Sequence, residues 1–124
     1  MIIAVDYDHT LDFAGWPNVG NLDMDRVNKL IECKKNGHQL ILWTCRSGKE
    51  LDDAVNLLKE NGLEFDAVNK NVKQYAHFES PKIVANVYID DAAFNADRFD
   101  WNSLLPQELN YEDKIVKTER EKYE

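Results

Sequence analysis

Residues 2–11 read IIAVDYDHTL, an apolar run that ends in two aspartates one residue apart, Asp6 and Asp8. Four consecutive apolar residues favour a strand that is buried on both faces of a parallel sheet, because an amphipathic helix would need a longer periodic pattern. Asp6 and Asp8 then lie at the carboxyl end of the strand, where open α/β sheets bind ligands. Aspartates also follow strands for local reasons, since they hydrogen-bond their own backbone. The stretch predicts a buried strand and leaves both explanations open for its acids.

A helix and a second strand are predicted next. Apolar residues recur every three to four positions in residues 23–36, and Asn36-Gly37 supplies a left-handed stop, so this segment predicts a helix. Residues 39–44 are again mostly apolar and predict a strand that ends in Thr44. Like the first predicted strand, this one is an apolar run that is followed directly by polar residues.

The middle of the chain predicts a second helix and a weaker strand. Ser47, with Glu50 three positions later, predicts a capping box at the start of a helix whose apolar residues share one face. Residues 63–69 predict a short third strand. Residues 71–80 are polar and mixed, and we expect at most one helical turn there.

The last predicted strand, residues 83–89, is rich in β-branched residues and ends in Asp90-Asp91. Strands that alternate with helices predict a parallel sheet with right-handed crossovers. We expect a Rossmann-like three-layer α/β sandwich with a mostly parallel sheet of about four strands, forming a single domain over residues 1–110. Residues 111–124 are rich in charge and predict an exposed tail or helix. This topology gathers the polar strand ends in one crevice: Asp6, Asp8, Thr44, Asp90 and Asp91.

The composition narrows the class of partner. The chain has 124 residues, with 15 basic and 23 acidic side chains and a formal net charge of -8. This charge disfavours nucleic acids and anionic membrane surfaces as partners. The two cysteines, Cys33 and Cys45, fit neither a disulfide framework nor a CxxC metal pair, and no run of about 18 apolar residues occurs. We expect a soluble cytoplasmic protein with reduced thiols.

The ordered polar residues resemble the motifs of a known superfamily. The sequence DYDHT at positions 6–10 resembles the DxDxT first motif of the haloacid dehalogenase superfamily. Thr44 resembles its second motif, Lys82 is the best candidate for its third, and Asp90-Asp91 resembles its acidic fourth motif. DxDxT alone is a weak signal, but the ordered combination, each part following an apolar strand, is specific.

The resemblance implies hydrolysis of a phosphate monoester. Asp6 would be the nucleophile and form an aspartyl-phosphate, which divides one difficult step into two. Asp8 would act as general acid toward the leaving group and then as base toward water. Members of the superfamily that act on carbon–halogen bonds lack the second aspartate, so Asp8 disfavours dehalogenase activity.

The resemblance also implies a magnesium site. Its ligands would be the Asp6 carboxylate, the Asp8 main-chain carbonyl and Asp90, with Asp91 bound directly or through water. Oxygen ligands suit Mg²⁺, and the neighbouring sequence offers no His and Cys cluster of the kind that zinc prefers.

Further residues are implied to bind the substrate. Thr44 and the backbone amide of Cys45 would hold phosphoryl oxygens, and Lys82 would neutralise the phosphoaspartate. Arg46 is a candidate for the substrate phosphate, with an ion pair to one of the many acids as the alternative.

Several positions leave alternatives open. Lys70 and Lys73 are also within reach of the role given to Lys82. His9 stands where the superfamily most often has glycine, so we expect the loop to be less free to adopt positive φ, although histidine is among the residues enriched there. His9 is either a loop residue that supports the site or a catalytic one. Trp16 in the first loop could stack on a substrate ring or pack as an ordinary loop residue.

The spacing of the motifs leaves no room for a cap domain. An open site is compatible with a large substrate, with closure by a homo-oligomeric partner, or with a small substrate held by the loop around Trp16. We expect a small phosphorylated metabolite, with a phosphoprotein as the alternative. The alternative function is a phosphoacceptor or non-catalytic phosphate-binding module on the same fold.

Overall fold

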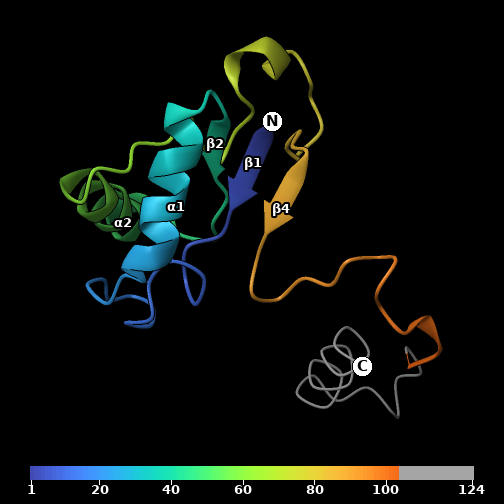
Figure 1. Ribbon diagram of the computed structural model, residues 1–124, viewed down its shortest axis with the longest axis horizontal. Coiled ribbons are helices and arrows are strands. Elements are labelled where there is room, and N and C mark those ends of the chain that lie inside the picture. The colour runs from blue at the N-terminus through green and yellow to red at the C-terminus, as the bar shows by residue number, and fades with distance from the viewer. Residues whose placement is uncertain (104–124) are drawn as a thin grey trace. The chain divides into compact units, whose positions relative to one another are not determined.

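The structure is a computed structural model that describes residues 1–103 (Figure 1). The chain divides into two units, Met1–Asp91 and Ala92–Glu124. Asp6, Asp8, Asp90 and Asp91, the acidic residues predicted to follow strands, all belong to the first unit. The predicted domain end at residue 110 and the predicted tail over 111–124 lie outside the described residues.

The first unit contains a four-stranded sheet in which every pair of neighbours is parallel. Its strands are β1 (Ile2–Val5), β2 (Gln39–Leu42), β3 (Ala67–Val68) and β4 (Val87–Ile89), in the order β3-β2-β1-β4. The prediction of a Rossmann-like parallel sheet is confirmed. Because β2 and β4 flank β1 on either side, the residues that follow all three strands meet at one edge.

Both α-helices of the first unit pack on the same face of the sheet (Figure 1). They are α1 (Met24–Lys35) and α2 (Gly48–Glu60). Val27 and Leu30 of α1 share a core with alternate residues of β1 and β2. Asp23 caps α1 by accepting a hydrogen bond from the Arg26 N–H. Ser47 is the N-cap of α2, but its side chain makes no capping hydrogen bond, so the predicted capping box does not form.

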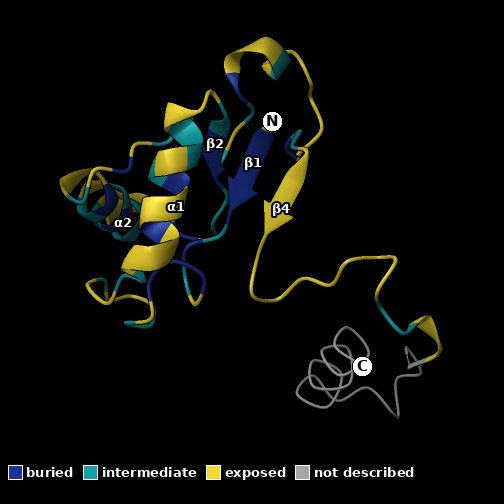
Figure 2. Cartoon of the chain, viewed as in Figure 1, coloured by how far each residue is buried: buried dark blue, intermediate teal, exposed yellow. Residues whose placement is uncertain are grey.

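The opposite face of the sheet is covered by the connection between β3 and β4. This segment contains one short 3₁₀ helix, η1 (Lys73–Tyr75), and packs Val72 and Ile83 against Ile2, Ala4 and Ile41. Each residue of β1 is therefore buried, as Figure 2 shows. Burial on both faces explains why β1 is apolar without alternation.

β4 is shorter and more exposed than its sequence predicts. The segment becomes a strand only at Val87, because Ile83 turns into the core and the Asn86 side chain accepts a hydrogen bond from the Ile2 N–H. The three residues of β4 are 37 to 43% exposed. Asp90 and Asp91 follow immediately at the edge of the sheet.

The described part of the second unit is built around aromatic side chains. The rings of Phe94 and Phe99 lie 4.8 Å apart, and Phe99 packs edge to face on Trp101, which starts the 3₁₀ helix η2 (Trp101–Ser103). Among the residues that the structure describes, no helix has the length and apolar character needed to cross a membrane.

Candidate metal and phosphate site

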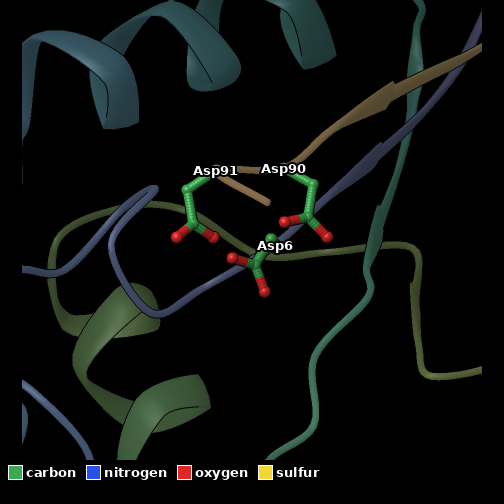
Figure 3. A group of neighbouring side chains, drawn as sticks. All are labelled: Asp6, Asp90 and Asp91. Atoms are coloured by element: carbon green, nitrogen blue, oxygen red, sulfur yellow. The ribbon is translucent and has the colours of Figure 1, made fainter. Parts of the chain in front are cut away.

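Three carboxylates converge at the carboxyl edge of the sheet. Asp6 directly follows β1, and Asp90 and Asp91 directly follow the neighbouring strand β4. The Asp6 N–H donates to the Ile89 carbonyl at 2.9 Å, which fixes the two strand ends side by side. One carboxylate oxygen from each of the three aspartates lies within 4.8 Å of the others, and Figure 3 shows the groups turned toward one another.

This arrangement concentrates negative charge at Asp6. Burial, a side-chain hydrogen bond with Asp91 and the charge of Asp90 together raise the pKa of Asp6 to about 7. Two unit charges about 4 Å apart repel by about 4 kcal/mol at an effective dielectric constant of about 20. A divalent cation offsets this repulsion, and an all-oxygen set of two exposed carboxylates and one half-buried carboxylate suits Mg²⁺ or Ca²⁺. The residues present therefore fit a hard cation.

The loop after Asp8 is organised by a buried aspartate that sequence reasoning missed. Asp12 is 1% exposed and accepts hydrogen bonds from the Tyr7 hydroxyl at 2.6 Å and from the N–H groups of Ala14, Gly20 and Asn21. Burial alone would raise the pKa of Asp12, but these four hydrogen bonds outweigh it and lower the pKa below 3.8. Asp12 thus ties residues 13–21 to the strand end that carries the site.

We expect Asp12→Ala to lower the free energy of unfolding by about 3–5 kcal/mol, because it leaves one buried hydroxyl and three N–H groups without their acceptor. The carboxylate of Asp12 stabilises the fold above its ordinary pKa near 3.8, and this contribution is lost as the pH falls through the lower pKa of the folded state. Urea denaturation at several pH values measures both effects. The exposed Asp25→Ala is the control, and equal losses in the two variants would contradict the role of Asp12.

His9 adopts positive φ, although a histidine was expected to make the loop less free to do so. Its φ is 61°, in the left-handed region, and its ring packs edge to face on Phe13 at 6.2 Å. The turn is closed by the His9 N–H, which donates to the Asp12 carbonyl at 2.9 Å. The turn at position 9 therefore requires positive φ, and His9 adopts it although it is not a glycine.

We expect His9→Gly to leave stability unchanged or to raise it by up to about 1 kcal/mol, because glycine adopts positive φ without strain. His9→Val should lower the free energy of unfolding by about 1–2 kcal/mol, because a branched side chain is disfavoured there. The midpoints of chemical denaturation of the two variants test this. A glycine variant as unstable as the valine variant would show that the His9 ring, rather than the backbone, is what matters.

The end of β2, which carries Thr44, lies beside the end of β1, which carries Asp6. Thr44 follows β2, and the Trp43 N–H donates to the Val5 carbonyl at 2.8 Å. The Thr44 N–H donates to the side chain of Asn69, which follows β3 with a φ of 54°. Among the described residues, the backbone hydrogen bonds of this edge do not include the N–H groups of Asp8 and Cys45. The sequence did not lead us to predict that Asn69 contacts the site. The available signal was that Asn69 follows a short predicted strand and precedes Lys70.

The structure separates the candidate lysines. Lys82 precedes β4, and its ammonium lies 5.5 Å from the centre of the Tyr88 ring. Lys73 is the first residue of η1. The next residue, Gln74, is hydrogen-bonded to the side chain of Gln39 at the amino-terminal end of β2. Lys70 directly follows Asn69, at the edge of the sheet that carries the acids. The backbone therefore brings Lys70 to the site edge, whereas Lys73 lies at the opposite edge.

Asp8 and Arg46 form a two-pronged ion pair. The Arg46 Nε donates to Asp8 Oδ2 at 3.0 Å, and Nη2 donates to Oδ1 at 2.8 Å. The Arg46 side chain is 1% exposed, and its guanidinium lies over the Tyr7 ring at 4.8 Å. The hydrogen bond to Asp8, together with the charges of nearby acids, raises the pKa of Arg46 despite its burial. Asp8 is not one of the three clustered carboxylates.

A groove of about 840 Å³ adjoins the acidic cluster. Asp90 and Asp91 line it together with Thr10, whose hydroxyl donates to Asp6 at 3.1 Å. Leu30 and Ile89 contribute apolar surface from α1 and β4. The cluster is therefore open on the side of α1.

Comparison with known proteins supports the fold without supplying a family. No protein-family model matches the chain, and no curated protein matches it. The chain is similar to a solved structure of a conserved protein from Bacteroides thetaiotaomicron, with a TM-score of 0.67 and 29% identity. The match covers 98% of this chain and 91% of that one. The similarity agrees with a small open α/β fold.

Proposed function

We propose that this protein is an Mg²⁺-dependent phosphohydrolase of the haloacid dehalogenase type that cleaves a phosphate monoester through an aspartyl-phosphate on Asp6. The observation that carries the proposal is the convergence of Asp6, Asp90 and Asp91 beside the end of β2, where Thr44 lies. An acidic cluster alone would fit any cation site. Its position next to a strand-end hydroxyl, at the carboxyl edge of a parallel sheet, favours a phosphate ligand.

The roles follow from the placement of each group. The Asp6 carboxylate attacks phosphorus and the ester oxygen leaves, so the phosphoryl group is carried by Asp6 until water displaces it. The Thr44 hydroxyl and the Cys45 N–H hold phosphoryl oxygens. Asp8 gives a proton to the leaving oxygen and then takes one from the attacking water.

The metal site uses the same strand ends. Asp6, Asp90 and Asp91 would hold Mg²⁺ with the Asp8 carbonyl, and the bound ion supplies positive charge against the phosphoryl oxygens. Lys82 is the proposed partner of the phosphoaspartate, and Lys70, which follows Asn69, is the alternative.

The substrate we propose is a small phosphorylated metabolite, with a phosphoprotein as the alternative. The groove beside the cluster leaves room for the organic part of a small ester. The net charge of -8 argues against a nucleic acid.

A phosphoacceptor or non-catalytic phosphate-binding module is the second candidate, and one observation favours it. Both carboxylate oxygens of Asp8 accept hydrogen bonds from Arg46, so in this structure Asp8 is an ion-pair partner and not a free acid or base. A protein in which Arg46 keeps Asp8 from exchanging protons would form the phosphoaspartate and hydrolyse it slowly.

Phosphate release from a panel of aryl and alkyl esters, with Mg²⁺ and with a chelator, tests the proposal. We expect Mg²⁺-dependent turnover and a phosphoenzyme that decays within seconds. A phosphoenzyme that persists for hours would favour the phosphoacceptor module, and the absence of both turnover and phosphoenzyme would contradict the two candidates together.

A further inference from the structure

The Arg46 guanidinium has no N–H group left for a substrate. An arginine carries five N–H donors. In Arg46 two of them bind Asp8, and the other three bind the backbone carbonyls of Pro17, Asn18 and Glu50 at 3.3, 2.7 and 3.2 Å. With a side chain that is 1% exposed, Arg46 cannot reach out to a phosphate without giving up a partner.

The five bonds connect three separate parts of the fold. Asp8 belongs to the strand end of the site, Pro17 and Asn18 belong to the loop of residues 13–21, and Glu50 belongs to the first turn of α2. Arg46 itself follows Thr44, whose hydroxyl accepts a hydrogen bond from the Arg46 N–H. The Arg46 side chain therefore fixes the distance between Thr44, at the end of β2, and Asp8, the residue expected to transfer the proton.

We infer that Arg46 is a positioning residue that orients the Asp8 carboxylate toward the leaving group and anchors the loop of residues 13–21 beside Asp8. This inference rests on the proposed function. It replaces the substrate-phosphate role considered for Arg46, because a planar guanidinium that holds both carboxylate oxygens fixes the orientation of Asp8. The loop it anchors carries Trp16, which is 64% exposed one residue before Pro17.

The test compares leaving groups, because a residue that acts through Asp8 should matter most where protonation of the leaving oxygen matters most. We expect Arg46→Lys to lower kcat for an alkyl phosphate about 10- to 100-fold more than for an activated aryl phosphate, with little change in KM. Asp8→Ala should show the same preference. Adding Arg46→Lys to Asp8→Ala should cost little further activity on the alkyl ester, because the two residues act as a unit.

Lys49→Ala is the control. Lys49 lies next to Glu50 in α2, but its side chain is 83% exposed and pairs with Asp53. Its variant should treat the two esters alike. A loss in Arg46→Lys that is equal for both esters, or that appears in KM alone, would overturn the inference while leaving the proposed function intact.

Hydrogen exchange supplies a readout that does not depend on turnover. The amides of Phe13, Ala14, Asn18, Gly20 and Asn21 are bonded within the loop or to Asp12, so their exchange reports loop opening. We expect faster exchange of these amides in Arg46→Lys and not in Lys49→Ala. If the wild-type protein hydrolyses neither ester, the proposed function fails, and unchanged exchange in Arg46→Lys would then overturn the anchoring role as well.

Discussion

Asp6→Asn should abolish Mg²⁺-dependent phosphate release, by at least about 10⁴-fold, because the amide cannot form the aspartyl-phosphate. The same substitution should stabilise the metal-free protein. Asp6 has a folded-state pKa of about 7 against an ordinary value of 3.8, so its ionisation costs stability as the pH rises from about 4 to about 7. Removing the carboxylate removes that cost, and the gain should be largest above about pH 7.

Thermal unfolding in the presence of a chelator, together with the aryl phosphate assay, measures both effects in one variant. The control is Asp52→Asn, which removes an exposed carboxylate from α2. It should leave activity unchanged. Retained activity in Asp6→Asn would remove Asp6 from the role of nucleophile, and a loss of stability would contradict the repulsion within the cluster.

Mg²⁺ should stabilise the wild-type protein and be required for turnover. Binding to the folded state alone raises stability by about 2.7 kcal/mol when the free ion is at about 100 times its dissociation constant. The affinity should rise as the pH increases through about 7, because the ion competes with the proton on Asp6.

Titration of thermal stability with Mg²⁺ at several pH values tests this prediction. Asp90→Asn and Asp91→Asn should each weaken the response, and comparing them identifies which residue contributes more. Stabilisation of the same size in the double variant and in the wild type would place the bound ion elsewhere.

The sheet could be predicted from sequence because its signals are local. The apolar residues 2–5 and 39–42 are buried on both faces, so they form uninterrupted runs that stop where the polar residues begin. The convergence of Asp6 with Asp90-Asp91 then followed from parallel topology alone. β4 was overestimated because Ile83 and Ala85 are apolar for a different reason, which is that they cover the second face of the sheet.

The partners of the site residues could not be predicted in the same way. The sequence contains 23 acidic residues, and any of them could have been the partner of Arg46. Its pairing with Asp8, 38 positions away, depends on how the loop of residues 13–21 folds. Asp12 appeared as one more polar loop residue, because nothing in its neighbours indicates burial. Lys82 was favoured by its spacing from Asp90, whereas the path of the chain between β3 and β4 decides which lysine reaches the edge.

The covalent state of Asp6 during turnover tests the central claim most directly. The protein is mixed with an aryl phosphate and Mg²⁺, quenched in acid within the first turnover, digested, and examined by mass spectrometry. We predict one added phosphoryl group on the peptide that contains Asp6, absent in Asp6→Asn and lost over time as phosphate appears. Steady release of phosphate without a phosphorylated Asp6 peptide, or with the phosphoryl group on another residue, would contradict the proposed mechanism.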